Sequence, residues 1–357
     1  MPPIKAVQII PRLNEGGAER AVVDLAREHG KSGAAAHIIL SEGGALAGEV
    51  VRAGARFLRL PVASKNILTA PMRARRLYRA LLAIAPDLVH VHSRVPAWLH
   101  YFANRPLSIP TVSTVHGINS VNFYGKIMTA ADAVICPGTD AAAHVKKHYG
   151  ADAKVIGSGV DLEYFNPERA DAAAVSQMRE QWDLSGKRVI LLAGRLSAQK
   201  GHEILLHALA RLPADVAAVI AGDGRRQKRL AELARRLGVA GRTRFAGARR
   251  DMREIYALAD IVLSCAVKPE SFGRTIAEAL AMQKPVIAAD HGGARDIITA
   301  EECGGKLIPP ADAEALAAAL RAPPPDASTS RARIAARFTA ARMAEETLAV
   351  YQKVLRR

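Results

Sequence analysis

The sequence contains few of the residues that mark several common classes of protein. Only three of its 357 residues are cysteine, too few and too widely spaced for a disulfide scaffold, and aromatic residues make up 4% of the chain. No run of 18 apolar residues and no leader-like N-terminal segment is present, which argues against a membrane-spanning or secreted chain. Half of the residues are nevertheless apolar, so we expect a cytoplasmic α/β protein in a reducing compartment.

The formal net charge of +16 leaves three classes of anionic partner to consider: nucleic acid, an anionic membrane surface and a phosphate-bearing substrate. The cations are spread over both halves of the chain rather than gathered in a tail, and no known nucleic-acid-binding motif accompanies them. We therefore expect no nucleic-acid partner, and we favour a phosphate-bearing substrate together with an anionic membrane surface.

Apolar strand-like runs alternate with helical patterns along the whole chain, which predicts two doubly wound parallel sheets. We expect an N-terminal domain over residues 1–165, a C-terminal domain over 166–335, and a C-terminal helix over 336–357. The strand candidates are 7–10, 37–40, 57–60, 88–91, 111–115, 133–136 and 154–156, followed by 189–193, 217–221, 243–245, 261–264, 285–288 and 306–308.

The segment 268–296 concentrates glycine, carboxylate and cationic residues more densely than any other part of the chain. The apolar run 261–263 predicts a buried strand, and residues 275–282 have the composition of a helix. Between them lies the short loop Glu270-Ser271-Phe272-Gly273. This order places the N-terminus of a helix directly after a strand.

The start of that helix predicts a phosphate-binding site. Gly273 allows a ligand to approach the backbone closely, and the N–H groups of Arg274 and Thr275 are donors at the positive end of the helix dipole. Glu278 lies one turn further on the same face as Arg274, where its carboxylate can accept hydrogen bonds from a ribose diol. Glu270, in the loop, is placed to meet a sugar hydroxyl. An ordinary strand–helix unit with solvated glutamates remains the alternative.

A second cationic loop follows the strand candidate 189–193 and carries Arg195 and Lys200. Both cations lie at the carboxyl end of a strand, where a diphosphate needs them: Arg195 as a planar fork and Lys200 as a point charge. The spacing G-x-x-x-x-G-K-[S/T] is absent, so the sequence gives no reason to infer ATP hydrolysis.

In the first half, Gly16 and Gly17 follow the first strand candidate and open a helix. The turn lacks the G-x-G-x-x-G spacing, so a plain turn remains an alternative to a nucleotide-binding loop. His116 follows a strand and is expected in the ligand crevice, because ligands of open α/β sheets bind at the carboxyl ends of strands. His90 and His92 alternate along another strand; zinc is the alternative there, but no third ligand has suitable spacing.

Two basic and apolar stretches are candidates for a membrane contact. The segment 65–82 has the pattern of a cationic amphipathic helix, with Arg73 among its cations, and a solvated helix face is an equal alternative. Trp98, Tyr101 and Phe102 form the densest aromatic cluster, which core packing explains at least as well as an interfacial role.

Taken together, these motifs resemble the family 4 glycosyltransferases, which are retaining, nucleotide-sugar-dependent enzymes of the GT-B fold. The resemblance rests on the E-x7-E signature, and Gln283 departs from it because the family usually has glycine at this helix end. The matching elements are Glu270-x-Phe272-Gly273, Glu278-Ala279-Leu280-Ala281, Pro285-Val286-Ile287-Ala288, Gly292-Gly293, Gly16-Gly17-Ala18-Glu19, Thr114-x-His116, Gly194-Arg195-Leu196 with Lys200-Gly201, Gly222-x-Gly224, and Gly159-Val160-Asp161 with Phe165.

The resemblance implies two Rossmann-like domains that face a cleft, with an acceptor side in the first and a nucleotide-sugar site in the second. It assigns catalytic roles to His116, Glu270, Arg195 and Lys200. It assigns donor binding to Gly16, Gly17, Gly222, Phe272, Gly273, Arg274, Thr275 and Glu278. No metal and no cofactor are expected, since the sequence has no Asp-x-Asp pair to hold a cation on a sugar diphosphate.

The expected reaction moves a sugar from a nucleotide diphosphate to a glycan or lipid-linked acceptor in cell-envelope polysaccharide or lipopolysaccharide synthesis. A peripheral contact with the inner face of the membrane stays open. Two other functions also stay open: another GT-B sugar-nucleotide enzyme, such as a 2-epimerase, and a non-enzymatic basic binding protein.

Overall fold

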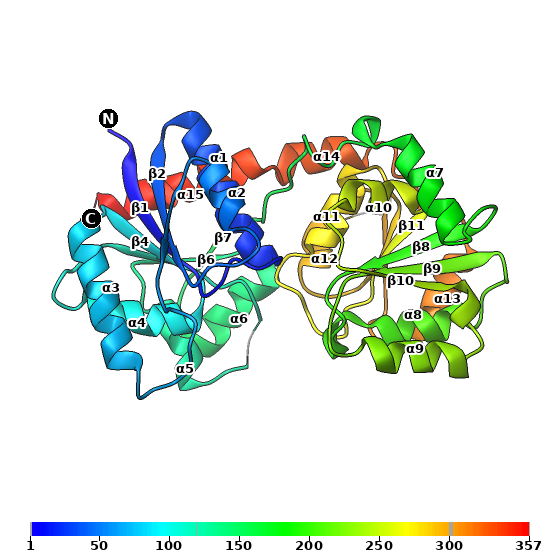
Figure 1. Cartoon of the computed structure of the whole chain (residues 1–357), viewed down its shortest axis with the longest axis horizontal. Coiled ribbons are helices and arrows are strands. Elements are labelled where there is room, and N and C mark those ends of the chain that lie inside the picture. Colours follow the sequence, from blue (N-terminus) through cyan, green and yellow to red (C-terminus); the bar gives the residue numbers. More distant parts are fainter. Residues whose placement is uncertain (1, 119, 300–302, 357) are drawn as a thin grey trace. The chain divides into compact units, whose positions relative to one another are not determined.

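A computed structural model describes residues 2–118, 120–299 and 303–356, which divide into two compact units (Figure 1). The first unit combines the chain up to Gly159 with the C-terminal segment that begins at Thr339, and the second is Val160–Phe338. The expected domain limits were residues 165 and 335. Each unit contains one parallel sheet, which confirms the predicted pair of Rossmann-like α/β domains.

The first unit contains a seven-stranded sheet in the order β3-β2-β1-β4-β5-β6-β7, in which every pair is parallel. The strand order reverses between β1 and β4, and ligands of open parallel sheets bind at such a point. The strands are β1 Ile4–Ile9, β2 Ala35–Ser41, β3 Arg56–Arg59, β4 Leu88–Val91, β5 Thr111–Thr114, β6 Ala133–Cys136 and β7 Lys154–Val155. The helices are α1 Gly17–Ser32, α2 Ala47–Arg52, α3 Ala70–Ile84, α4 Arg94–Asn104, α5 Phe123–Lys126, α6 Thr139–Tyr149 and α15 Ala340–Leu355.

The second unit contains a six-stranded parallel sheet in the order β10-β9-β8-β11-β12-β13, which reverses between β8 and β11. The strands are β8 Arg188–Ala193, β9 Val216–Ala221, β10 Thr243–Gly247, β11 Ile261–Ser264, β12 Val286–Ala289 and β13 Gly305–Ile308. The helices are α7 Ala172–Gln181, α8 His202–Leu209, α9 Gln227–Arg236, α10 Met252–Leu258, α11 Arg274–Ala281, α12 Gly293–Ile297, α13 Ala313–Arg321 and α14 Ser330–Arg337.

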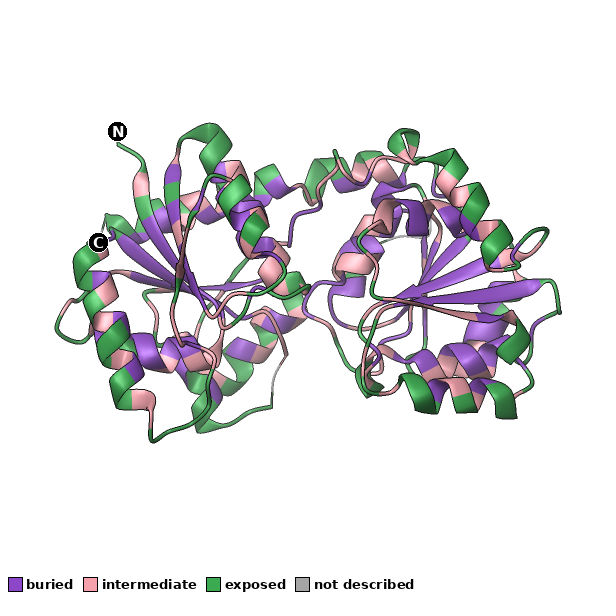
Figure 2. Cartoon of the chain, in the orientation of Figure 1, coloured by how far each residue is buried: buried purple, intermediate pink, exposed green. Residues whose placement is uncertain are grey.

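Continuous apolar runs form the central strands because both faces of each sheet are covered by helices. In β8, Val189 and Leu191 belong to a core cluster shared with α10 and α11, whereas Ile190 and Leu192 belong to a cluster shared with α8, α9 and α13. The period of two along a strand thus divides one apolar run between two cores. Figure 2 shows the central strands of both sheets coloured mostly as buried.

The end of α11 shows how Gln283 replaces the glycine that the family pattern favours. Gln283 adopts a left-handed conformation, with a φ angle of 53°, so the backbone makes the turn that was expected to suit glutamine poorly. Its side-chain amide donates a hydrogen bond to the Ser328 carbonyl at 2.8 Å. This bond offsets part of the left-handed strain, which is about 1–2 kcal/mol for a residue with a Cβ atom.

The C-terminal helix α15 completes the first unit by packing against α1. Tyr351 on α15 is fully buried, and its hydroxyl lies 2.8 Å from Nδ1 of the buried His90 on β4. The ring of His90 also meets the Tyr351 ring edge-on, at 5.6 Å between centroids. Among the described residues, no helix has both the length and the apolar character needed to cross a bilayer.

We expect Tyr351→Phe to lower the free energy of unfolding by about 1–3 kcal/mol, because it leaves a buried imidazole nitrogen without its partner. Urea unfolding of the purified protein measures this loss. Gln352→Ala, one residue further on the exposed face of α15, is the control and should change stability by less than about 0.5 kcal/mol. Equal stability of the two variants would contradict the assignment.

Candidate functional site

The loops at the carboxyl edge of the second sheet are packed backbone against backbone. Gly201, at the start of α8, has a φ angle of 70°, and a Cβ atom there would lie 1.8 Å from the carbonyl oxygen of Cys265, which follows β11. Gly222, which follows β9, is packed as tightly. A Cβ atom at this position would lie 2.0 Å from the carbonyl oxygen of Gly194, which follows β8. Gly201 and Gly222, of which the sequence analysis assigned Gly222 to donor binding, therefore allow the loops of neighbouring strands to pack together.

An ion pair joins the loops on either side of the point where the strand order reverses. Nζ of Lys200, after β8, lies 2.5 Å from Oε1 of Glu270, after β11, and each side chain is about a quarter exposed. The Glu270 carbonyl accepts a hydrogen bond from the Gly293 N–H at 2.8 Å, which ties this loop to α12. Two residues that lie 70 positions apart in the sequence are thus brought together, as the predicted site requires.

Arg195 also lies in the loop after β8, and its side chain is exposed. The loop is short and ordered by backbone contacts, since the Leu196 N–H donates to the Asp223 carbonyl at 2.9 Å. Arg195 and Lys200 therefore both lie at the carboxyl edge of β8, where a planar cationic fork and a point charge are available to an anion.

Gly273 is the N-cap of α11, in a left-handed conformation with a φ angle of 97° and without a side-chain cap. The expected helix over 275–282 begins one residue earlier, at Arg274. Thr275 is partly buried, whereas Phe272 is buried and packs edge-on against Phe338, at 5.4 Å between ring centroids. The Phe272 side chain thus contributes to the core beneath the loop.

Glu278 is bound through both of its carboxylate oxygens. The Tyr256 hydroxyl donates to Oε2 at 2.9 Å, and Nε of Arg274 donates to Oε1 at 3.3 Å. Tyr256 is fully buried, and burial together with the adjacent carboxylate raises its pKa well above the usual 10. No sequence motif pointed to this tyrosine, because it lies on α10, outside every recognised motif, and reaches Glu278 only in the folded unit.

His202, the first residue of α8, was also missed by the sequence analysis. Its side chain is buried, and burial together with the nearby Lys200 cation lowers the pKa of the imidazole to about 4. A neutral histidine therefore lies beneath the cationic loop at neutral pH, and it adds no charge to Arg195 and Lys200.

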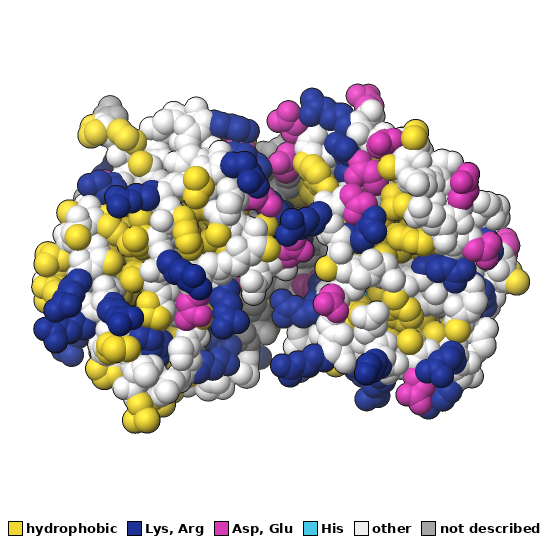
Figure 3. Space-filling view, viewed as in Figure 1, with side chains coloured by type: hydrophobic (Ala, Val, Ile, Leu, Met, Phe, Trp, Pro, Cys, Tyr) yellow, Lys and Arg dark blue, Asp and Glu magenta, His cyan; other side chains and the backbone are white. Residues whose placement is uncertain are grey.

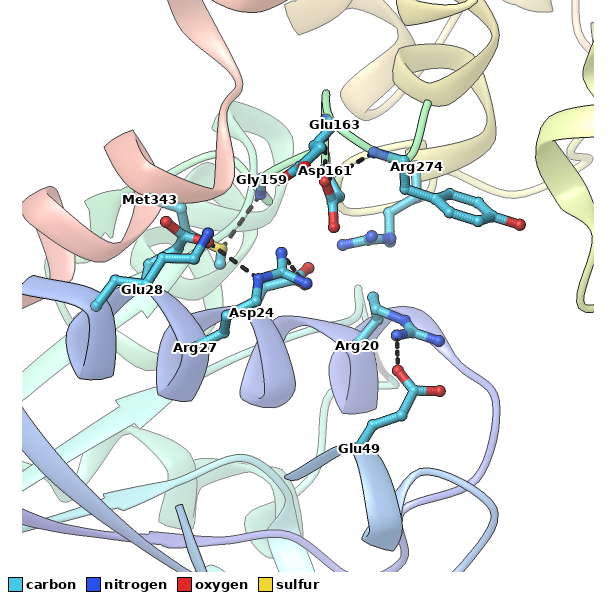
Figure 4. A network of polar contacts seen from close by, with 12 residues as sticks. Arg20, Asp24, Arg27, Glu28, Glu49, Gly159, Asp161, Glu163, Arg274 and Met343 are labelled. Carbon is cyan, nitrogen blue, oxygen red and sulfur yellow. Dashed lines mark hydrogen bonds and ion pairs between the residues drawn. The ribbon is translucent and has the colours of Figure 1, made fainter. Parts of the chain in front are cut away.

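In the first unit, the β1–α1 turn places Gly16 and Gly17 at the start of α1. Gly16 is the N-cap in extended conformation, and a Cβ atom there would lie 2.4 Å from Oε2 of Glu19 in the first turn. Arg20, one residue further, forms an ion pair with Glu49 of α2, which Figure 4 shows from close by. The glycine turn thus lies next to an ion pair within the first unit.

His116 follows β5 and is partly buried, and burial lowers the pKa of its imidazole to about 4. Its Nε2 lies 2.9 Å from Nδ1 of His92, which directly follows β4. His90 bonds Tyr351 and Thr114 rather than a shared ion. Within residues 2–118, 120–299 and 303–356, no group of three or more His, Cys, Asp or Glu side chains is placed to hold a metal ion.

The predicted cationic helix 65–82 corresponds to α3, which begins at Ala70, and one of its predicted cations does not reach the surface. Arg73 is buried, and its Nη2 donates to the Asn66 carbonyl at 2.6 Å. Arg75, Arg76 and Arg79 are exposed as expected.

Comparison with known proteins gives two family matches that together span most of the chain. Residues 15–164 match the family described as Glycosyltransferase Family 4, and residues 175–333 match the family described as Glycosyl transferases group 1. The two matches fall one on each compact unit. A crystal structure of a glycosyltransferase from Rickettsia africae superimposes with a TM-score of 0.88 at 27% identity and covers 99% of both chains.

Two curated relatives share about a third of their aligned residues with the chain. A D-inositol 3-phosphate glycosyltransferase of Xylanimonas cellulosilytica is 31% identical over 62% of this chain, and the match spans 60% of that relative's length. A GDP-mannose-dependent alpha-mannosyltransferase of Mycobacterium tuberculosis is 32% identical over 84% of this chain and 82% of the relative.

The tight approach at Gly201 predicts a large penalty for a methyl group. Gly238 has the same φ angle of 70° but open space around it, so Gly238→Ala measures the left-handed strain alone, about 1–2 kcal/mol. Gly201→Ala should cost a further 1–3 kcal/mol, roughly, because the Cys265 loop must move. Urea unfolding of both variants checks the difference; equal losses would mean that the loop contact is not restrictive.

Proposed function

Because the chain belongs to the family 4 glycosyltransferases, we propose that it transfers a sugar from a nucleotide diphosphate sugar to a hydroxyl of a glycan or lipid-linked acceptor. The observation that carries the proposal is the meeting of Lys200 and Glu270 at the carboxyl edge of the second sheet, beside the start of α11. A diphosphate and a sugar hydroxyl require a cation and a carboxylate at such a place.

The departing diphosphate is stabilised by the protein's own positive groups. Arg195, Lys200 and the N-terminus of α11 lie on the loops after β8 and β11, so they are held in place before the charge develops. In the structure the Lys200 cation is paired with Glu270. When a diphosphate pairs with the Lys200 ammonium group, the Glu270 carboxylate is released and can accept hydrogen bonds from the sugar.

The nucleotide ribose is bound by Glu278. A carboxylate offers about four lone-pair positions, and Tyr256 and Arg274 use one on each oxygen. The remaining positions suit the two hydroxyls of a ribose diol. Because Tyr256 and Arg274 approach different oxygens, they fix the plane of the carboxylate before the nucleotide binds.

Transfer with retention at the anomeric carbon is the stereochemical outcome that the family resemblance favours. A double displacement needs a carboxylate nucleophile, and Glu270 is ion-paired with Lys200, which stabilises its charge and reduces its nucleophilicity. This supports a positioning role for Glu270 and a route in which the leaving phosphate takes the proton of the acceptor hydroxyl. The name of one relative, a D-inositol 3-phosphate glycosyltransferase, favours a polyol acceptor over lipopolysaccharide in particular, and the name of the other favours GDP-mannose as a donor.

We expect Arg195→Ala and Lys200→Ala each to lower kcat/KM for the nucleotide sugar about 100-fold, because each removes a stabiliser of the leaving diphosphate. Arg236→Ala, which removes an exposed arginine of α9, is the control and should keep the wild-type rate. Product formation from a nucleotide-sugar panel is read by mass spectrometry. Wild-type rates in either site variant would overturn the phosphate assignment. A glycosyltransferase releases nucleotide when an acceptor is present, whereas an epimerase needs no acceptor, so acceptor-dependent release of nucleotide distinguishes transfer from epimerisation.

We also propose that the first unit docks on an anionic lipid bilayer through a surface on α3, α4 and α5. In Figure 3 apolar and cationic side chains are interspersed over the region of α3 and α4. Ile67, Leu68 and Phe123 are 83%, 90% and 78% exposed, which is unusual for side chains of this size. The α3–α5 surface consists of Ile67, Leu68, Met72, Tyr101, Phe102 and Phe123 together with Arg75, Arg76 and Arg79.

Contacts connect part of the α3–α5 surface. Trp98 of α4 lies within 6 Å of the rings of Phe102 and Phe123, at 5.9 and 5.8 Å between centroids. Arg75 of α3 lines the same shallow hollow as Phe102. Three arginines near an anionic membrane contribute about 3 kcal/mol, which is too little for stable docking without inserted apolar side chains.

Co-sedimentation with vesicles of phosphatidylcholine and phosphatidylglycerol at low salt tests the docking. Wild-type protein should sediment. The double variant Leu68→Ser, Phe123→Ser should reduce the bound fraction several-fold, and so should the triple variant in which Arg75, Arg76 and Arg79 are replaced by Glu. The triple change of Lys228, Arg235 and Arg236 to Glu, on exposed positions of α9, is the charge-matched control. Failure of the wild-type protein to sediment would overturn the proposal.

A further inference from the structure

We propose that His291 is a positioning residue for Glu270: it fixes the loop after β11, and thereby sets how tightly the sugar portion of the donor is bound. The inference rests on the proposed function for what the Glu270 carboxylate meets, whereas the contact of His291 with the loop belongs to the fold itself. His291 lies in the loop after β12 and is not among the residues to which the family resemblance assigned a role.

The loop after β11 leaves the core of the second unit and returns to it within a few residues. Ala266 is buried, Lys268 and Pro269 are exposed, and Phe272 is buried again. Glu270 therefore lies on a short segment between two buried ends. The place of its carboxylate depends on how firmly each end is held.

The end that leads into α11 is held by the core and by α12. The ring of Phe272 packs edge-on against Phe338, and a Cβ atom at Gly293 would lie 1.9 Å from the Phe272 carbonyl oxygen. The Gly293 N–H also donates to the Glu270 carbonyl at 2.8 Å. These contacts do not involve the side chain of His291, so we expect the start of α11 to keep its place when that side chain is changed.

The end that follows β11 is held by the neighbouring loops. Nε2 of His291 lies 2.8 Å from the Ala266 carbonyl oxygen, and it must donate because a carbonyl only accepts. The Val267 N–H donates to the Gln199 carbonyl, in the loop after β8, at 2.8 Å. Since β11 lies between β8 and β12 in the sheet, the loops of both neighbouring strands bind this end.

The bond to Ala266 can be removed by itself. Nδ1 of His291 is buried and has no hydrogen-bond partner in the part of the chain that the structure describes, so Nε2 alone ties the ring to a polar group there. Leucine is close to imidazole in size. His291→Leu therefore removes one hydrogen bond and keeps most of the packing around the ring.

A shift at Ala266 is passed on to Glu270 because the segment between them is stiff. The ring of Pro269 fixes its φ angle near about −65°, and the residue before a proline, here Lys268, is confined to extended conformations. Little rotational freedom is left to absorb a displacement. The position of the Glu270 carboxylate opposite Lys200 thus depends on the bond from His291.

The sugar portion of the donor should sense this bond more than the nucleotide portion does. The groups proposed to bind the diphosphate and the ribose are Arg195, Lys200 and Glu278, which lie in the loop after β8 and on α11, outside the segment 266–270. Glu270, the group proposed to bind the sugar, lies on that segment. Loss of the His291 bond should therefore weaken binding of a nucleotide sugar and spare binding of the free nucleoside diphosphate.

Amide hydrogen exchange of the full chain, read by mass spectrometry, tests the tie without any ligand. In His291→Leu the peptide that contains Val267 should exchange several-fold faster, because its bond to Gln199 is less well held. His291→Gln places an N–H donor near the position of Nε2 and should restore the wild-type exchange. Wild-type exchange in His291→Leu would overturn the proposal.

Calorimetric titration with GDP, GDP-mannose, UDP and UDP-glucose tests the consequence for the donor. For the pair that the wild-type protein binds, His291→Leu should lower the affinity for the nucleotide sugar about tenfold and leave that for the free nucleotide within about twofold. His291→Gln should recover the affinity for the nucleotide sugar. Equal losses for sugar-bearing and free nucleotide would contradict a positioning role, and so would no loss at all.

His207→Leu is the matched control. His207 is a partly buried histidine in the last turn of α8, at the end of that helix away from the carboxyl edge of the sheet. Its replacement should leave both the exchange of the Val267 peptide and the two affinities unchanged. Effects as large as those of His291→Leu would mean that loss of any histidine disturbs this unit, which overturns the specific role of His291.

The two measurements separate this inference from the proposed function. If His291→Leu speeds exchange but the wild-type protein binds none of the four compounds, the proposed function and the sugar-binding role fail together, while the tie between His291 and the loop stands. If the wild-type protein binds and transfers a sugar and His291→Leu does so with unchanged kcat/KM, the positioning role alone is overturned.

Discussion

The close packing of loop backbone on loop backbone at the carboxyl edge of the second sheet is the constraint on which the donor side depends. Parallel strands bring all their carboxyl ends to one edge, so the loops after β8, β9 and β11 must share a small space. Gly201 and Gly222 allow contacts that any side chain would prevent. That contact in turn sets the distance at which Lys200 and Glu270 meet across the point of reversal.

The first unit differs from the second because its sheet contains buried polar side chains, which need hydrogen-bond partners. Gln8, His37 and His92 lie on neighbouring elements and satisfy one another, so the cost of burying them is met by a continuous set of hydrogen bonds. The C-terminal helix supplies the Ala344 carbonyl to His29, which lies next to His37 in this set.

Much of the fold was predictable from the sequence, because a strand buried on both faces must be apolar throughout and the helices between strands have their own period. The motif at 268–296 likewise predicted a strand, a loop and a helix, and α11 begins within one residue of its expected start. Arg73 shows the limit of reading a segment by its composition. It was counted among the cations of the helix, yet it lies on the same face as Leu77 and Leu81 and is buried with a bond to the Asn66 carbonyl.

The sequence by itself determined the alternation of strands and helices and the family motifs, because these depend on local periodicity and on residues that are neighbours in the chain. Only the tertiary structure decided the partners of those motifs: Glu270 for Lys200, Tyr256 for Glu278, and His92 for His116. These partners are far apart in sequence and are joined by strand order and register. No local pattern encodes which loops meet at one edge of a sheet.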